Sequence, residues 1–258
     1  MAASGDQVKP WGLSLSGRAG IVVPRFEVAA HRIGFIASIA GKERGPMVED
    51  VCLSGAHVRL EPLGRHHVDG LVRASADGGE LYRWSPVPRT FEAAGAYVET
   101  ALEWKAQGTG LAFAVISQER DEVIGSTRFF DLKRWAWPAD HPRAQEGRFD
   151  TGEIGYTWLT PAAIRTAANS EAKLLLLTHA FETWRMHCVC FHADARNARS
   201  RAALSRLGAQ FEGVLRSHRL AADHIARDSA RFSITAAEWP QVRSECLARL
   251  QRAREKLL

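Results

Sequence analysis

Between Pro161 and Ser170 a short polar loop joins a predicted strand to a predicted helix, and its chemistry is that of an anion site. Residues 151–160 are rich in β-branched and aromatic side chains, which favour a strand. Pro161 cannot continue a strand ladder, so the chain leaves the sheet there. A helix beginning near Ser170 directs unpaired N–H groups and the positive end of its dipole at whatever precedes it. We therefore expect this loop to bind phosphate.

Two aromatic segments are suited to line a substrate site. Residues 81–88 hold Tyr82 and Trp84 followed by two prolines, and are too aromatic for a simple linker. Residues 131–150 hold Trp135 and Trp137, and loops of this length in compact domains are functional or disordered. We expect Trp135 to form a wall over a substrate, with packing against the domain's own surface as the alternative.

The elements that position these residues follow from hydrophobic periodicity. The helix after Ser170 places its apolar residues on one side, and Thr90 and Gly208 stand at a helix N-cap and a helix C-cap. The predicted order is β-α-α-β-β-β-α-β-α-β-β, an α/β (α+β) domain. The expected elements are strands at 58–62, 111–117, 123–130, 151–160, 187–193, 209–216 and 230–234, and helices at 64–76, 90–102, 170–184, 198–207 and 238–258.

Composition sets the broad class. The chain has 258 residues, 46% of them hydrophobic and 24% charged, with a formal net charge of +5. These values fit a soluble globular protein with one sizeable core. Its Lys and Arg residues are scattered rather than gathered in a stripe, so no nucleic-acid partner is expected. No apolar run is long enough to span a membrane.

Four cysteines form no disulfide framework. Cys188 and Cys190 lie two apart in a predicted strand, where two side chains share a face but are poorly placed to bridge. His187 and His192 lie nearby, but no second ligand pair at a zinc-like spacing follows, so no metal is expected. Reduced cysteines fit a cytoplasmic protein.

Residues 1–46 differ from the rest of the chain. They have no sustained periodicity and lack the features of a signal peptide. The preferred hypothesis is that Met47 is the true start, because codons for Lys42-Glu43 can resemble a bacterial ribosome-binding site; a poorly ordered extension is the alternative. Analysis of the native N-terminus by mass spectrometry tests this.

The predicted order resembles the GNAT superfamily of acyl-CoA-dependent N-acetyltransferases, in particular its ribosomal-protein N-terminal acetyltransferase-like (RimJ/RimL type) branch. The residues that carry the resemblance are Glu153-Ile-Gly-Tyr-Thr-Trp158, Asn169 with Glu171-Ala-Lys173, Asn197-Ala-Arg-Ser200, Arg206-Leu-Gly208 and Glu212-Gly213. The resemblance implies a mixed, mostly antiparallel twisted sheet flanked by helices, with splayed central strands. It places the catalytic domain at 53–239 and leaves 240–258 as a C-terminal helix.

The resemblance also implies a cofactor site for acetyl-CoA. Backbone groups of the strand end would pair with the pantetheine arm, and the loop would wrap the pyrophosphate. Asn197 would contact pantetheine and Ser200 would protonate the departing thiolate; the alternative makes Asn197 only a helix cap and Ser200 an ordinary first-turn residue. The implied cofactor residues are Trp158, Leu159, Thr160, Arg165, Thr166, Ala167, Ala168, Asn169, Ser170 and Asn197.

This sequence departs from the family pattern at three positions. Ile164 and Ala167 stand where the loop usually carries Gln and Gly; a Cβ at Ala167 that crowds the pyrophosphate, or that disfavours a positive φ, would weaken CoA binding. Arg219 stands where close relatives have a glutamate base, and arginine cannot accept a proton. Glu153 is the predicted base, acting directly or through water, unless it only holds the sheet edge. His218 is second.

The predicted activity is transfer of an acetyl group from acetyl-CoA to a primary amine by direct attack in a ternary complex. The acceptor, a small amino compound or a protein N-terminus, would lie between Tyr82, Trp84 and Trp135. The alternative is a non-catalytic acyl-CoA-binding module, which the departures at Ile164, Ala167 and Arg219 favour. A homodimer through the last strands or the C-terminal helix is compatible with the sequence.

Overall fold

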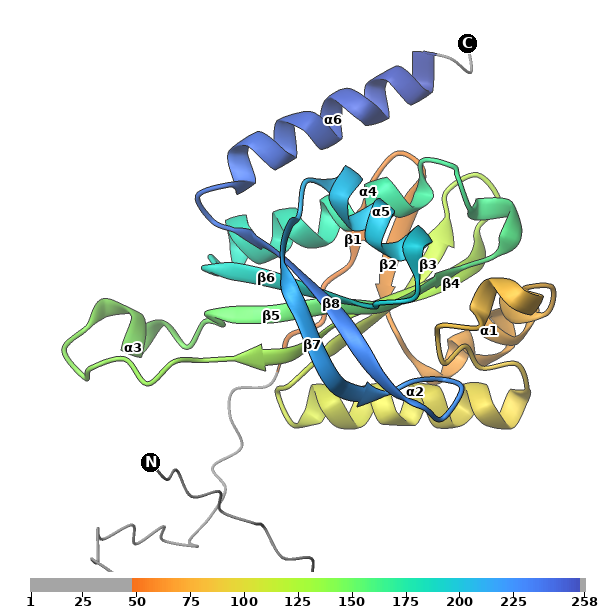
Figure 1. Cartoon of the computed structure of the whole chain (residues 1–258), viewed down its shortest axis with the longest axis horizontal. Coiled ribbons are helices and arrows are strands. Elements are labelled where there is room, and N and C mark those ends of the chain that lie inside the picture. Colours follow the sequence, from red (N-terminus) through yellow and green to blue (C-terminus); the bar gives the residue numbers. More distant parts are fainter. Residues whose placement is uncertain (1–47, 256–258) are drawn as a thin grey trace, which may run out of the picture. The chain divides into compact units, whose positions relative to one another are not determined.

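One mixed sheet forms the frame of the molecule (Figure 1). The computed structural model describes residues 48–255, so the expectations for residues 1–46 lie outside it. The sheet has eight strands in the order β1-β2-β3-β4-β5-β6-β8-β7, and only β5 and β6 run parallel. This confirms the predicted mixed, mostly antiparallel sheet. The strands are β1 (Leu53–Ser54), β2 (Val58–Pro62), β3 (Leu111–Ser117), β4 (Glu122–Lys133), β5 (Thr151–Leu159), β6 (Cys188–Asp194), β7 (Gln210–Leu220) and β8 (Ala226–Thr235).

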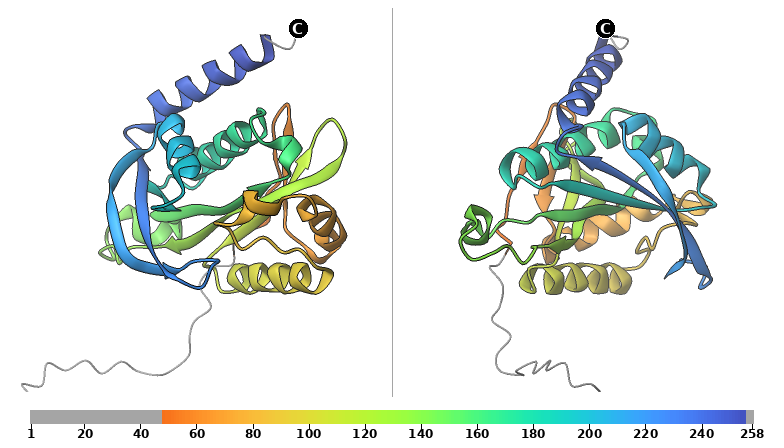
Figure 2. Two further views of the ribbon diagram at one scale, coloured as in Figure 1. Left: turned by 45° about the vertical axis from the view of Figure 1, so that its right-hand side comes forward. Right: turned by 60° about the vertical axis from the view of Figure 1, so that its left-hand side comes forward.

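Helices cover both faces of this sheet (Figure 2). One face carries α1 and α2, and the other carries α4 with α5 and α6. None of the helices within residues 48–255 is both long and apolar enough to cross a membrane. The helices are α1 (Val68–Ser75), α2 (Phe91–Ala106), α3 (Pro142–Glu146), α4 (Ala168–Thr178), α5 (Ala198–Leu207) and α6 (Trp239–Glu255).

Strand β3 shows how one sequence serves two cores. All seven of its residues are buried, and alternate side chains point to opposite faces. Phe113 and Val115 join the core on the α4 side, whereas Ala112 and Ala114 join the core under α1 and α2. A strand covered on both faces reads as a continuous apolar run, as this one does.

The two predicted helix caps are confirmed. The side-chain oxygen of Thr90 accepts a hydrogen bond of 3.1 Å from the N–H of Ala93 and starts α2. Gly208 ends α5 with a φ of 101°, a left-handed conformation that glycine adopts without a Cβ penalty. Local sequence therefore sets where these helices begin and end.

The central strands splay apart. β5 pairs with β6 at only three positions, the last being Glu153 with Cys190, and then remains paired with β4 alone to Leu159. β6 instead follows β8 along its whole length. The edge of β5 after Glu153 therefore faces β6 without a described strand partner, as the predicted splay requires. A bulge interrupts the β4–β5 ladder here, with Tyr156 at a φ of 51°.

Some predicted boundaries were wrong. The last hairpin is longer than predicted, with β7 reaching Leu220 and β8 starting at Ala226. Most side chains near its tip are exposed or half-buried, so the tip lacks the apolar alternation that marks a strand. The helix expected from Ser170 begins at Ala168 and continues past Thr178 as a single π turn.

Candidate active site

The loop between β5 and α4 has the backbone of an anion site. Arg165 takes a φ of 63°, and α4 begins at Ala168. The hydroxyl of Thr166 accepts a hydrogen bond from the N–H of Ala168 and donates one to the carbonyl of Ala163. No described residue accepts a hydrogen bond from the N–H groups of Arg165, Thr166 or Ala167. These donors precede the positive end of the helix and have no acceptor among the described residues, so they are available to an anion.

The expected backbone strain at Ala167 does not occur. Ala167 has a φ of −65°, an ordinary helical value, and the left-handed position of the loop falls on Arg165 instead. A non-glycine residue in this region costs free energy and is held there by its surroundings. The Cβ of Ala167 therefore does not oppose the conformation of its own backbone.

Glu171 fixes the start of α4, a role that the sequence did not reveal. Its buried carboxylate accepts hydrogen bonds from the N–H groups of Ala56, His57 and Val58 at 2.8, 2.7 and 2.8 Å. A Cβ on Gly55 would lie 2.3 Å from the carboxylate carbon, so glycine permits this approach. The turn between β1 and β2 thus anchors the first turn of the helix beside the loop.

Tyr82 holds the end of β5. Its ring is only 5% exposed and meets the buried ring of Trp158 edge-on, with centroids 5.8 Å apart. Its hydroxyl donates a 2.9 Å hydrogen bond to the carbonyl of Leu159, and burial raises the pKa of Tyr82. The exit of β5 into Thr160 is fixed by a hydrogen bond from the Thr160 N–H to the carbonyl of Ile124.

Trp84 and Asn197 meet at one pocket of about 210 Å³. The side-chain oxygen of Asn197 caps α5 by accepting a 3.0 Å hydrogen bond from the N–H of Ser200, which leaves the amide nitrogen of Asn197 to donate elsewhere. The hydroxyl of Ser200 makes no hydrogen bond to a described residue. The structure therefore brings the predicted acceptor residue Trp84 together with the predicted cofactor residue Asn197, whereas Ser200 does not line this pocket. The pocket is lined by Glu80, Leu81, Trp84, Asn197, Ala198 and Arg199.

Glu153 lies at the point where β5 and β6 separate. Its carboxylate is buried and receives two hydrogen bonds from the guanidinium of Arg219, at 3.2 and 2.8 Å. His192 Nδ1 lies 2.9 Å from Glu153 Oε2, although its angle is poor for a hydrogen bond. The rings of His192 and His218 lie 4.7 Å apart. Burial, with the charges of Arg219 and His192, lowers the pKa of His218 and favours its neutral, proton-accepting form.

Sequence reasoning treated Arg219 only as a missing base and did not find its ion pair with Glu153. The two residues are 66 positions apart, and their contact depends on how β7 and β8 fold over the sheet. The available signal was an acid on the predicted strand 151–160 and an arginine just beyond the predicted strand 209–216, neither with an assigned partner.

Trp135 does not join Tyr82 and Trp84. It follows the end of β4, where Lys133 pairs with Thr151 at the start of β5, and so lies at the opposite end of β5 from Leu159. Its ring stacks on His187 with centroids 5.1 Å apart, and the backbone N–H of Trp135 donates a 2.7 Å hydrogen bond to the buried carboxylate of Asp150. These contacts are those of a loop packed against its own domain, the alternative left open by the sequence.

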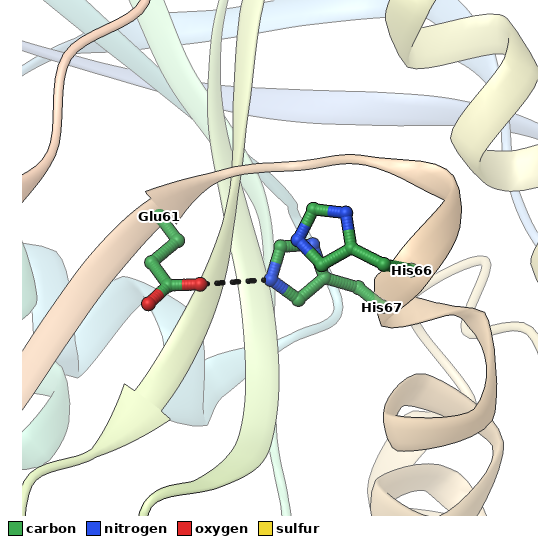
Figure 3. A group of neighbouring side chains, drawn as sticks. All are labelled: Glu61, His66 and His67. Carbon is green, nitrogen blue, oxygen red and sulfur yellow. Dashed lines mark hydrogen bonds and ion pairs between the residues drawn. The ribbon is translucent and has the colours of Figure 1, made fainter.

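One group of potential metal ligands occurs among the described residues. Glu61, His66 and His67 place one ligand atom each within 4.8 Å of one another (Figure 3). However, Arg59 bonds Glu61 at 2.6 Å, and His67 Nε2 lies 3.1 Å from the other carboxylate oxygen. His67 Nδ1 accepts a hydrogen bond from the N–H of Gly64, so Nε2 carries the proton in the neutral ring. The atoms of Glu61 and His67 that could bind a metal ion are thus engaged by other residues of the protein.

Comparison with known proteins assigns the class of this arrangement. Residues 57–210 of the 258 match the family model described as the acetyltransferase (GNAT) domain. The chain therefore belongs to the GNAT family, and it is an acetyl-CoA-dependent N-acetyltransferase. This confirms the predicted family and enzyme class. No curated protein sequence matches the chain.

Three solved structures illustrate the similarity. A GCN5-related N-acetyltransferase from Brucella melitensis is 28% identical with a TM-score of 0.67, covering 80% of this chain and 87% of that chain. A structure from T. thermophilus, described as an acetyltransferase, is 35% identical with a TM-score of 0.63, covering 79% and 98%. Mycobacterium smegmatis RimJ, in complex with CoA-disulfide, shares the fold at 21% identity with a TM-score of 0.62, covering 79% and 94%.

Proposed function

We propose that this protein transfers the acetyl group of acetyl-CoA to a primary amine, either a protein or peptide N-terminus or a small amino compound, by direct attack in a ternary complex. The observation that carries the proposal is the unpaired edge of β5, which leads into the free N–H groups of the loop before α4. An amide-bearing arm matches the strand edge, and a pyrophosphate matches the loop.

In this proposal the backbone of Trp158, Leu159 and Thr160 binds the pantetheine arm. The loop and first helical turn, comprising Arg165, Thr166, Ala167, Ala168, Asn169 and Ser170, bind the pyrophosphate, with Arg165 adding a side-chain charge. The amide nitrogen of Asn197 donates to the pantetheine arm. This use is compatible with the cap, because the cap occupies only the side-chain oxygen.

Proton transfer is assigned to groups on both sides of the splay. The hydroxyl of Ser200, at the start of α5, protonates the departing thiolate. Glu153 receives the proton of the attacking amine through a water, since Arg219 occupies both of its oxygens. Neutral His218 is the second candidate for this base. A pH–rate profile separates the two: the fall in rate at low pH, where the base becomes protonated, should persist in Glu153→Gln and disappear in His218→Gln if His218 is the base.

Tyr82, Trp84 and Trp135 were the predicted acceptor residues. We retain Trp84 as an acceptor contact, because it shares a pocket with Asn197. We assign Tyr82 to positioning the end of β5, because its hydroxyl is bonded to Leu159. The surroundings of Trp135 support packing rather than substrate contact.

Two further aspects belong to the proposal. A protein N-terminus as acceptor is supported by fold likeness to ribosomal-protein acetyltransferases from Vibrio species, at 16–17% identity. A homodimer is supported by the free edge of β7, with exposed Phe211 and Val214.

The competing function is an acyl-CoA-binding module without turnover, which the engagement of Glu153 by Arg219 favours.

The test is release of free thiol from acetyl-CoA with a panel of N-terminal peptides, amino acids and polyamines, with CoA binding followed by calorimetry. Acceptor-dependent release that falls at least tenfold in Asn197→Ala and Ser200→Ala, but not in Ser205→Ala, supports the proposal. Ser205 is the matched control because it is exposed on the same helix, and its hydroxyl bonds only the carbonyl of Arg201. Binding without release across the panel supports the acyl-CoA-binding module instead.

A further inference from the structure

Arg128 is a buried arginine with no carboxylate partner among the described residues. It lies on β4, is 2% exposed, and has no carboxylate within ion-pair distance among the described residues. Its Nε and Nη2 atoms are buried and have no hydrogen-bond acceptor among those residues. Arginine stays protonated in proteins, so the charge cannot be removed by losing a proton. Such a group is costly to bury without a partner, which distinguishes it from an ordinary core residue.

Three aromatic rings form a cage around this guanidinium. The guanidinium carbon lies 4.3 Å from the ring centroid of Tyr97, 4.6 Å from that of Tyr156 and 5.2 Å from that of Trp104. Cation–π attraction explains how the buried charge is tolerated. A ring face is not a conventional hydrogen-bond acceptor, so the guanidinium N–H groups still lack acceptors. All three rings are half-buried, so the cage lies close to the surface.

The cage adjoins the proposed reaction centre. Arg128 pairs with Gly155 on β5, and the next pair on the same face joins Phe130 to Glu153. Tyr156 lies at the bulge on the unpaired part of β5, and its ring meets Phe130 edge-on. The phosphate loop starts α4, which packs on the opposite face of the sheet, so the phosphates of CoA do not explain an anion requirement here.

The charge balance around the cage is positive. Arg227 on β8 interacts electrostatically with both Tyr156 and Glu153. Its buried Nε also has no hydrogen-bond acceptor among the described residues. The pKa of Arg227 is lowered, first by burial and then by the charge of Arg219. Glu153 is already bound by Arg219, so it does not neutralise Arg128. Excess guanidinium charge beside Arg128 attracts an anion.

We propose that Arg128, in its cage of Tyr97, Trp104 and Tyr156, binds a carboxylate of the acceptor, so that the preferred substrate is an amine that also carries a carboxylate. This rests on the proposed function. The planar fork of arginine matches a carboxylate with two parallel hydrogen bonds, which satisfies the orphaned N–H groups and fixes the amine at the splay.

The kinetic test compares acceptors that differ only in charge. The pairs are the C-terminal amides Ala-Glu-NH2 and Ala-Gln-NH2, and alanine with alaninamide, each with wild-type protein and Arg128→Met. Wild-type kcat/KM should favour the member with the carboxylate by about 10- to 100-fold, the size expected for a charge-assisted pair. Arg128→Met should reduce this ratio to near one by lowering kcat/KM for the member with the carboxylate. Amidation also lowers the pKa of the alanine amine, but this difference cancels when the two proteins are compared.

Arg59→Met is the matched control. Arg59 lies on β2 and forms ion pairs with Glu61 and Asp121. The variant therefore loses one positive charge away from the cage and should keep the wild-type ratio of kcat/KM values. Equal rates for both members of each pair with wild-type protein would overturn the proposal without any variant. An equal loss on both members in Arg128→Met would also overturn it, because it would make Arg128 purely structural.

A binding measurement separates this inference from the proposed function. Propionate and propionamide are titrated while tryptophan fluorescence is followed, since Trp104 lies in the cage. Propionate alone should change the signal, and Trp104→Phe and Arg128→Met should each abolish the change, whether or not any amine is acetylated. No response to propionate, or an equal response to inorganic phosphate, would refute the carboxylate assignment. If Arg128→Met fails to fold, Arg128→Lys keeps the charge and should retain only part of the preference.

Discussion

Lys173 on α4 should make the stability of this protein depend on pH. Its side chain is 7% exposed, and its ammonium donates hydrogen bonds to Thr157 Oγ1 at 2.6 Å and Thr127 Oγ1 at 3.2 Å. No carboxylate pairs with it among the described residues. Burial lowers the pKa of Lys173 from 10.5 to about 7, because the charged form loses its hydration. The change we consider is Lys173→Met, which keeps the length of the side chain and removes the titrating group.

The sign follows from proton binding. Between pH 7 and 10.5 the unfolded chain holds a proton on Lys173 that the folded chain has lost. Stability therefore rises with pH in this window, by up to about 1.4 kcal/mol per pH unit, and the full penalty is present below pH 7. From pH 7.5 to 9.5 the contribution of Lys173 should amount to about 2 to 3 kcal/mol.

Urea unfolding at pH 6.5, 7.5, 8.5 and 9.5 measures this contribution. The stability of wild type minus that of Lys173→Met should rise across the series, because every other titrating group is common to both proteins. Lys105→Met is the control, since Lys105 pairs with Asp50 at the surface. A difference that stays flat from pH 7.5 to 9.5 would show that Lys173 keeps its proton in the fold, and the reasoning from burial would be wrong.

Three further changes test the supports of the site. Glu171→Gln should lower the free energy of unfolding by about 2 to 4 kcal/mol, since three N–H groups lose a charged acceptor, and should weaken CoA binding in calorimetry; an unchanged affinity would show that the β1–β2 turn does not position α4. Arg219→Met should cost about 2 to 4 kcal/mol in urea unfolding, because it leaves the buried carboxylate of Glu153 without its partner, and adding Glu153→Met should restore part of the loss. Additive losses in the double variant would contradict this pairing. Tyr82→Phe should cost about 1 kcal/mol and lower kcat/KM for acetyl-CoA, since the hydroxyl holds the carbonyl of Leu159; wild-type kinetics would separate Tyr82 from the site.

The sequence was sufficient for features that depend on neighbours along the chain. Thr90 and Gly208 cap their helices as predicted because capping is decided within one turn. The position of the loop between β5 and α4 was predicted correctly because Pro161 ends a strand and a periodic helix follows. The family pattern supplied the splay, which periodicity alone does not contain.

Features that depend on distant contacts were missed. The left-handed residue of the loop is Arg165 rather than Ala167. The pair of Glu153 with Arg219 requires the final strand order β6-β8-β7, which the sequence does not state. Trp135 was expected over a substrate, but the partner of its ring is His187, 52 residues later, at the far end of β5.

The three-position contact between β5 and β6 also has a mechanical meaning. It divides the sheet into two panels, β1 to β5 and β6 to β8, hinged at Glu153 and open beyond it. An extended ligand that bonds the edge of β5 would act as a replacement strand and brace one panel against the other. Hydrogen exchange at residues 154–159 should therefore slow when CoA binds, so that the cofactor stiffens the same frame that holds it.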